Sequence, residues 1–424
     1  MASAVAADEA AGSRPALEDL PEWQGTVVRP KTDWLLDNTS FKAGVFRGAG
    51  PNELVLANGL IARTFRLAPN AATVALDNLV TGEAILRGVK PEAIVAIDGQ
   101  RYEVGGLTGQ PNYAFLRPEW LENLRANPGA FQFVGFEVGR PAERLAWKRV
   151  RHHAPGVKWP PDGSYPGDVC QGEQHPGHRG LADSRWTQWR TISDFYKWCR
   201  GEGIFLNVPD HYFLAGSNKT GMGYREVNWS LPREQQVIHT RQNIFDGTWE
   251  KTPSMGWMFV PLTEYQGGGS AATIEPLDEH LDHYERMLTA NLALGVQACY
   301  RGPRLYDSDR TKAMVKRWVD WFKTHREILE SDLIHGRRAD ARDLDWMLHV
   351  NPQATEKGLL VVFNPLGHTV ERTLRVNVYY TGLSDIVQVS EEGGPATTVP
   401  VQRDYTMDLR VQVPPQAMKW FVLK

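Results

Sequence analysis

Short apolar runs separated by turn residues dominate the chain from about Thr26 to Val138, and this spacing predicts β-strands. Asn58-Gly59 and Asp98-Gly99 are strong turn signals next to these runs. The pattern is typical of an all-β sandwich. The expected strands are Glu53–Ala57, Leu60–Leu67, Thr73–Leu76, Ala93–Ile97, Arg101–Val104 and Phe131–Val138.

Helical and strand-like patterns alternate between about Pro160 and His335. Strands that alternate with helices imply a parallel sheet. The expected strands are Ile204–Val208, Gly256–Leu262 and Gly295–Tyr300. The expected helices are Asp183–Arg200, a helix that begins near Pro276, and Asp309–Leu329.

From Leu359 to Lys424 the pattern returns to strands: Leu359–Phe363, Leu374–Tyr380, Leu409–Val413 and Trp420–Leu423. The fold class expected is therefore multidomain, α/β plus all-β. The predicted domains are a flexible N-terminus (1–25), a β-sandwich-like domain (26–160), a (β/α) barrel-type region (161–345) and a small C-terminal β-sandwich (346–424).

A long polar segment with many aromatic residues is expected to follow the strand that ends at Val208, as a loop that includes Asn218–Ser230 and Arg241–Lys251. Loops of this length are usually functional or disordered, and disordered segments lack aromatic residues. The aromatic residues here are Tyr212, Phe213, Tyr224, Trp229, Phe245 and Trp249. Their mixture with carboxylates, Asn and Arg indicates a site for a neutral, hydroxyl-rich ligand such as a sugar.

Composition narrows the choice of partners. The net charge of -3, with 23% charged residues and no run of like charge, argues against nucleic acid and anionic membranes. The 15 Trp side chains suit both protein cores and sugar stacking. The N-terminus does not have the pattern of a signal peptide, and no apolar run is long enough to span a bilayer. A soluble protein is expected, whose compartment and oligomeric state stay open.

The chain gives little indication of a metal or cofactor. Cys170, Cys199 and Cys299 have neither disulfide-framework nor metal-site spacing. His175 and His178 are close in sequence, but no third ligand follows at a useful spacing. We expect no metal and no cofactor.

Segments in all three regions resemble the large α-galactosidase-like glycoside hydrolases. The N-terminal run Asn58–Phe65 with Asn70–Asn78, and the closing run Gly358–Pro365, look like the two ends of such enzymes. Between them, Asp162–Asp168, Asn207–Asp210 and Lys251–Pro261 resemble segments of their (β/α)8 barrel. The resemblance implies an N-terminal sandwich, a barrel and a C-terminal sandwich.

The implied chemistry is retaining hydrolysis of a terminal glycosidic bond by two carboxyl groups. Carried onto this sequence, Asp162 is the candidate nucleophile and Asp210 the candidate acid/base. Asp162 also fits a turn before Gly163, and Asp210 also fits a helix cap or a loop. Asp246, Glu250 and Glu264 are reserves for the acid. Residues expected to contact sugar hydroxyls or the sugar ring are Lys219, Arg225, Glu226, Asn228, Trp229 and Arg301.

The middle region is too short for a complete barrel, which takes about 250 residues. Relative to the family, an internal segment near residues 160–162 is expected to be absent, which leaves a partial barrel and impairs activity. Two alternatives remain open: a carbohydrate-binding protein without catalysis, and a truncated product without independent function. Sugar identity and anomeric preference rest on the resemblance alone.

Overall fold

The computed structural model describes residues 15–25, 33–139, 190, 194–195, 197–199, 201–204, 207–208, 221–222, 231–249, 257–264 and 268–424. The chain divides into two compact units. The first contains Met1–Val150 with Asp340–Arg342, and the second contains Arg151–Ala339 with Asp343–Lys424. Each unit has β-sheets, which agrees with a multidomain, sheet-rich protein. The prediction of four segments with boundaries at 25, 160 and 345 stays a prediction.

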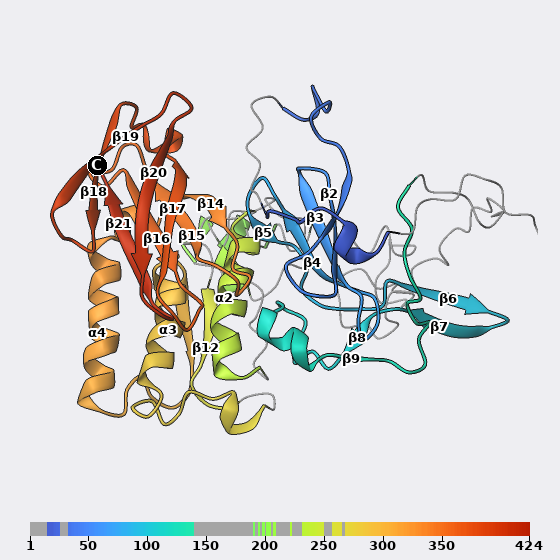
Figure 1. Ribbon diagram of the computed structural model, residues 1–424. Helices are drawn as coiled ribbons and strands as arrows, with labels where there is room; N and C mark the ends of the chain where they lie inside the picture. Colours follow the sequence, from blue (N-terminus) through green and yellow to red (C-terminus); the bar gives the residue numbers. More distant parts are fainter. Residues whose placement is uncertain are drawn as a thin grey trace, which may run out of the picture. The chain divides into compact units, whose positions relative to one another are not determined.

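The first unit is built on a five-stranded antiparallel sheet in the order β1-β2-β3-β4-β5 (Figure 1). Gly59 has φ of 88° in the turn before β3, and Asp98 and Gly99 have φ of 50° and 82° between β6 and β7, as their turn sequences predict. The elements are β1 (Gly44–Arg47), β2 (Glu53–Ala57), β3 (Ile61–Arg66), β4 (Ala72–Asn78), β5 (Glu83–Ala84), the antiparallel pairs β6 (Ala93–Ile97) with β7 (Gln100–Val104) and β8 (Leu107–Thr108) with β9 (Arg125–Ala126), and the 3-10 helices Leu17–Asp19 and Pro118–Asn123.

The strand expected at Phe131–Val138 is wrong. Phe131 forms an isolated bridge with Val104, residues 132–137 are not in a strand, and Val134 is almost fully exposed. The buried Asn70 side chain takes the place of strand pairing: its Nδ2 donates to the carbonyl of Phe131 (3.1 Å), and its Oδ1 accepts from the N–H of Phe133 (2.7 Å). Hydrogen bonds from the Asn70 side chain therefore hold the backbone at Phe131 and Phe133, in a segment whose apolar pattern favoured a strand.

The second unit contains two parallel strand pairs, β10 with β11 and β12 with β13. Helices α2, α3 and α4 lie next to one another in sequence order (Figure 1). The elements are β10 (Asn207–Val208), β11 (Gly221–Met222), α2 (Arg233–Gly247), β12 (Trp257–Pro261), a 3-10 helix (Gly269–Ala271), α3 (Leu281–Leu292), β13 (Gln297–Arg301), α4 (Asp309–Thr324) and α5 (Arg326–Leu329). Residues 190, 194–195 and 197–199 are helical, within the helix predicted there. The described residues form no closed barrel.

Helix α2 corrects the prediction of a loop over Arg241–Lys251, because residues 241–247 are helical. Val237, Ile238, Arg241, Ile244 and Phe245 repeat at helical spacing and are all buried. Two of these side chains pack against the C-terminal sheet, so the segment gains its apolar contacts as a helix.

Helix α3 begins at Leu281 rather than near Pro276, because the intervening residues form turns. The turn is held by Asp307, which accepts hydrogen bonds from the backbone N–H groups of Leu277 and Asp278. The predicted helix Asp309–Leu329 is present as α4 and α5.

A six-stranded antiparallel sheet in the order β14-β15-β16-β21-β18-β19 dominates the end of the chain. A two-stranded ribbon, β17 with β20, packs on one of its faces through a shared apolar cluster. The strands are β14 (Asp332–Arg337), β15 (Asp345–Val350), β16 (Gly358–Phe363), β17 (Val370–Asn377), β18 (Ile386–Glu391), β19 (Ala396–Pro400), β20 (Thr406–Val413) and β21 (Met418–Leu423).

Strand β16 is buried on both faces, which explains its continuous apolar sequence. Leu360 and Val362 join the cluster under the β17–β20 ribbon. Leu359, Val361 and Phe363 join a second cluster with residues of α2, β12 and α5. The sheet thus connects the β-ribbon to the strand–helix layer within the second unit.

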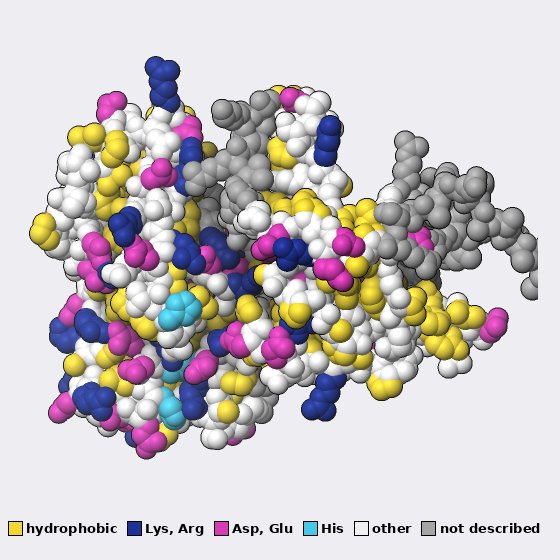
Figure 2. Space-filling model, in the orientation of Figure 1, with side chains coloured by type: hydrophobic (Ala, Val, Ile, Leu, Met, Phe, Trp, Pro, Cys, Tyr) yellow, Lys and Arg dark blue, Asp and Glu magenta, His cyan; other side chains and the backbone are white. Residues whose placement is uncertain are grey.

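Basic and acidic side chains are interspersed on the molecular face drawn in Figure 2. This distribution agrees with the balanced composition of the chain. None of the described helices has the length and apolar character needed to cross a membrane.

Candidate functional site

The carboxyl ends of β12 and β13 form the edge of the second unit where chemistry-bearing loops begin. The two strands pair in parallel from Trp257 with Gln297 to Pro261 with Arg301, so the loops that follow them begin at the same edge. All five residues of β12 are buried. In sheets with parallel strands and helical crossovers, ligands bind at this edge.

Arg301, the last residue of β13, is held in place at this edge. Its guanidinium carbon lies 4.4 Å from the ring centroid of Phe259, a cation–π distance. Its backbone carbonyl accepts hydrogen bonds from the N–H groups of Leu262 (2.8 Å) and Thr263 (3.2 Å). Arg301 is thus fixed through its backbone and supported by an aromatic ring.

The next residue, Gly302, allows the segment that follows β13 to approach closely the segment that follows β12. A Cβ atom at this position would lie 2.6 Å from the Cβ of Leu262, a fully buried residue. Only glycine fits here without a shift of the backbone.

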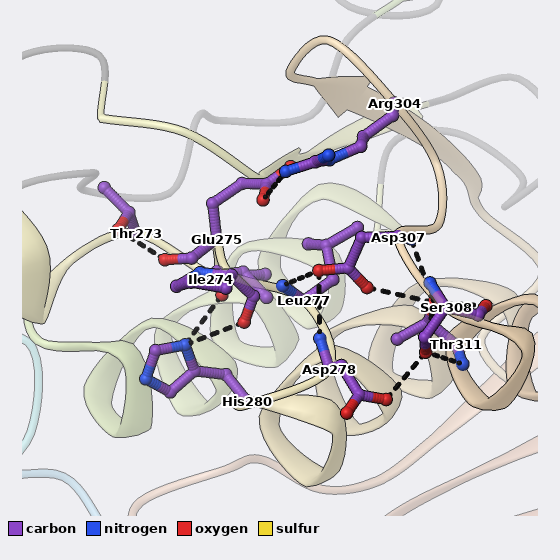
Figure 3. Close-up of polar contacts among 11 residues, drawn as sticks. Thr273, Ile274, Glu275, Leu277, Asp278, His280, Arg304, Asp307, Ser308 and Thr311 are labelled. Atoms are coloured by element: carbon purple, nitrogen blue, oxygen red, sulfur yellow. Dashed lines mark hydrogen bonds and ion pairs between the residues drawn. The ribbon is translucent and has the colours of Figure 1, made fainter.

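The loops that follow the two strands are joined by an ion pair between Glu275 and Arg304. The guanidinium donates from Nε (3.0 Å) and Nη2 (2.9 Å) to the two carboxylate oxygens (Figure 3). The Glu275 side chain is 16% exposed, whereas that of Arg304 is 54% exposed. The hydrogen bond and charge of Glu275 raise the pKa of Arg304. The planar bidentate geometry fixes the relative orientation of the two loops.

Asp307 forms the second connection between these loops. One carboxylate oxygen, Oδ2, accepts from the N–H groups of Leu277 (2.8 Å) and Asp278 (3.2 Å), and Oδ1 accepts from the Thr311 hydroxyl (3.2 Å). Burial acts to raise the pKa of Asp307, but the hydrogen bonds from Asp278, Thr311 and Leu277 outweigh it and lower the pKa. Asp307 is therefore held as a carboxylate.

Asp278 links the loop before α3 to the start of α4. Its carboxylate accepts from the Ser308 hydroxyl (2.6 Å) and from Nη1 of Arg310 (3.1 Å). Ser308 is also the N-cap of α4, where its hydroxyl accepts from the N–H of Thr311 (3.1 Å). Figure 3 shows Asp278 and Ser308 pointing toward one another from the two loops.

His280 completes the loop before α3. Its Nδ1 lies 2.8 Å from the carbonyl oxygen of Ile274 and 3.2 Å from that of Pro276. Because carbonyl oxygens only accept, Nδ1 carries the proton in this arrangement.

Most of the sequence-predicted site residues lie outside the described residues, so the structure does not bring them together or separate them. These are Asp162, Asp210, Lys219, Arg225, Glu226, Asn228 and Trp229, together with the reserve Glu250 and the pair His175 and His178. Arg301 is described, and it lies at the edge discussed above. No cluster of three or more metal-ligating side chains occurs among the residues that the structure describes.

The other two reserve acids are in different environments. Asp246, in α2, accepts two hydrogen bonds of 2.8 Å from Nε and Nη2 of Arg338. Glu264 is exposed, three residues beyond the end of β12. The bidentate partner gives Asp246 a structural role, and Glu264 is the reserve nearest in sequence to the edge.

The sequence reasoning missed Glu275, Arg304 and Asp307. Their signal was positional: each follows β12 or β13 in the chain, before the next α-helix begins. Proximity to a strand end was used to select Asp210, and the same criterion would have pointed to Arg304 and Asp307, which lie three and six residues beyond β13. Glu275 lies 14 residues beyond β12, too far for that criterion.

No family model matches this chain, and no curated protein matches it. Among solved structures, it is similar to alpha-galactosidase I from Mortierella vinacea, with 12% identity, a TM-score of 0.29, and coverage of 45% of this chain and 44% of that chain. It is also similar to a GH27 β-L-arabinopyranosidase from Geobacillus stearothermophilus, with 11% identity, a TM-score of 0.36, and coverage of 57% and 54%.

A third structure, the alpha-amylase from Geobacillus thermoleovorans complexed with acarbose, has 9% identity, a TM-score of 0.30, and coverage of 58% of this chain and 66% of that chain. The chain spans about half the length of the first two enzymes. These neighbours are glycoside hydrolases, but likeness at such TM-scores does not establish a shared family or activity.

Proposed function

We propose that this chain is a retaining glycoside hydrolase of the α-galactosidase type, which acts on terminal glycosidic bonds. The observation that carries the proposal is the order β12–α3–β13–α4, followed by an antiparallel sandwich, with polar side chains at the carboxyl edge of the parallel pair. This order matches the layout implied by the sequence resemblance. The carboxyl edge is where (β/α) enzymes bind their substrates.

In the proposed mechanism, Asp162 attacks the anomeric carbon and Asp210 protonates the leaving oxygen. Asp210 then removes a proton from the water that hydrolyses the covalent intermediate, which restores the starting configuration. Arg301 donates hydrogen bonds to sugar hydroxyls from the edge of the sheet. Lys219, Arg225 and Asn228 donate in the same way from the preceding loop, and the carboxylate of Glu226 accepts from a sugar hydroxyl. Trp229 packs against the ring.

The connections Glu275–Arg304 and Asp307–Leu277 support this site by fixing the two loops that follow β12 and β13. Catalytic groups need positions accurate to about 0.5 Å, and paired loops provide such rigidity. The carboxylates of Glu275, Asp278 and Asp307 are occupied by partners, so in this proposal they position the site and leave the chemistry to Asp162 and Asp210.

The test is hydrolysis of a panel of aryl α- and β-glycosides by the full chain. Asp162→Asn is expected to abolish turnover, and Asp210→Asn to lower kcat by about 10²–10⁴-fold. Glu279→Gln is the matched control, because this exposed carboxylate lies in the loop before α3 and its replacement leaves turnover unchanged. Product stereochemistry followed by NMR is expected to show retention.

A nucleophile assignment has its own readout. In an Asp162→Gly variant, added azide is expected to occupy the vacated space and form a glycosyl azide of inverted configuration. Hydrolysis that persists in Asp162→Asn would refute the assignment of Asp162. If the chain folds cooperatively but turns over no glycoside, the proposal that it is a glycoside hydrolase is refuted.

A carbohydrate-binding protein without catalysis is the second candidate. The observation that favours it is that Glu275, Asp278 and Asp307 are all committed to contacts between loops. It predicts sugar binding without turnover, and equal affinity in the chain and its Asp162→Asn variant.

A further inference from the structure

A cavity of about 610 Å³ lies within the first unit, over one face of its five-stranded sheet. Its volume falls in the range of small-molecule sites. Leu56, Arg63 and Leu76 are directly paired across β2, β3 and β4, and all three line the cavity. The floor is thus a guanidinium between two leucines.

The Arg63 guanidinium has a fixed position on this floor. Its Nε donates to the Thr73 hydroxyl (2.9 Å), its Nη2 pairs with Glu92, and its guanidinium carbon lies 4.6 Å from the ring centroid of Phe65. Glu92 also accepts from the N–H of Thr73 (2.5 Å). These contacts leave Nη1 without a hydrogen-bond partner among the described residues.

Lys90 adds a second cation to the lining of the cavity. Its ammonium lies 3.5 Å from the ring centroid of Tyr113 and has no carboxylate partner in the described part of the chain. Tyr113 in turn occupies space at Gly88, where a Cβ would lie 2.5 Å from a ring carbon. The aromatic ring therefore supports the ammonium and leaves its N–H groups available.

Asn58, which also lines the cavity, has a side-chain donor that is not used within the described structure. Its Oδ1 accepts from the N–H groups of Leu60 (2.9 Å) and Ile61 (3.0 Å), so Nδ2 points away from these bonds as an unused donor within the described structure. Three groups that can only donate therefore belong to residues that line one cavity: Nη1 of Arg63, Nζ of Lys90 and Nδ2 of Asn58.

The charges of the lining set the charge of a suitable ligand. Arg63 and Lys90 are cationic and Glu92 is anionic, which leaves one uncompensated positive charge. Leu56, Ile61, Leu76 and Leu86 make the walls mainly apolar, and Leu56 and Ile61 are 41% and 47% exposed to solvent without a ligand. Donor-only groups require an acceptor, and exposed apolar walls favour an apolar body.

We propose that this cavity binds an amphipathic monocarboxylate, with its carboxylate on Lys90 and Arg63 and its apolar part against Leu56 and Leu76. The site lies in a different unit from the proposed glycosidase site and does not depend on that function. The ligand is an aliphatic or aryl carboxylic acid.

The test is titration calorimetry of the full chain with octanoate, 1-octanol and octylammonium. We expect octanoate to bind, and the equally long alcohol and amine to bind at least about tenfold more weakly, because a charge-assisted hydrogen bond is lost. Lys90→Gln is expected to weaken octanoate binding by a similar factor. Lys323→Gln, which removes an exposed lysine from α4, is the matched control and is expected to have no effect.

Leu56→Glu is a second variant that tests the floor of the cavity. Because Leu56 is 41% exposed, the substitution is tolerated by the fold, and its carboxylate repels the ligand. Circular dichroism checks that both variants fold. The proposal is overturned by an absence of octanoate binding, by equal binding of the three compounds, or by octanoate binding that Lys90→Gln and Leu56→Glu leave unchanged.

Discussion

Arg241 in α2 and Asp345 in β15 form a bidentate ion pair inside the second unit, with N–O distances of 2.7 and 2.8 Å. Their side chains are only 4% and 5% exposed. The guanidinium carbon also lies 4.7 Å from the ring centroid of Phe363 on β16. This pair joins α2 to the C-terminal sheet at a position where the sequence predicted a polar loop.

Removal of one partner is expected to destabilise the protein strongly. Arg241→Met removes the bidentate guanidinium from the buried Asp345 carboxylate, and should cost about 3–5 kcal/mol of unfolding free energy. Urea denaturation provides the measurement. Arg410→Met, which removes one partner of the exposed pair with Glu371, is the control and should cost at most about 1 kcal/mol. Similar losses in the two variants would contradict the buried role.

The fully buried His349 makes stability depend on pH. Its Nε2 lies 3.1 Å from the carbonyl oxygen of Ala293, so Nε2 carries the proton, and Nδ1 has no partner among the described residues. Burial lowers its pKa to about 4. Between the ordinary pKa of 6.5 and this value the unfolded chain binds more protons, so the stabilisation is complete above pH 6.5 and is lost as pH falls toward 4.

The expected loss from His349 is on the order of 3 kcal/mol across this window. The measurement is the free energy of unfolding at several pH values for the protein and for His349→Gln. The variant should have a flatter profile between pH 6.5 and 4. Parallel profiles would show that another group controls the pH dependence. The next residue to substitute is then the partly buried His335, because burial lowers its pKa to about 4.

Asp307→Ala is expected to release the turn before α3. The substitution removes acceptors from the N–H groups of Leu277 and Asp278, and hydrogen bonds to charged groups contribute about 1.5–3 kcal/mol. Faster hydrogen exchange at these two amides is the direct readout. Glu279→Gln, in the same loop, should leave their exchange unchanged. Unaltered exchange in Asp307→Ala would disprove the role of the carboxylate as an anchor.

Gly302→Ala is expected to displace the loop after β13, because the new Cβ meets buried Leu262 at 2.6 Å. Overpacking of this kind costs about 1–3 kcal/mol. Gly367→Ala is the matched control, since a Cβ there has no neighbour within 4 Å and the residue has no positive φ. Thermal denaturation of both variants tests this expectation. Equal melting temperatures would show that the segments at residues 262 and 302 can move apart without loss of stability.

Local patterns determined much of the fold. Strand β2 and the turns at Asn58-Gly59 and Asp98-Gly99 follow from alternation and turn chemistry in the sequence. Helix α4 follows from its apolar spacing, and its start at Asp309 follows from the Ser308 cap. These elements depend on residues close to one another in the chain, so the sequence alone contains the necessary information.

Long-range contacts decided the rest. Helix α2 has the spacing of a helix, but its polar composition concealed that Arg241 is satisfied by Asp345, 104 residues later. The Phe131 segment has an apolar pattern, yet the side chain of Asn70 holds it outside a sheet. The connection of Glu275 with Arg304 joins two loops that only the parallel pairing of β12 and β13 brings together. Sequence determined the local elements because their causes are local; the tertiary structure decided which charges meet, because that depends on which strands and helices become neighbours.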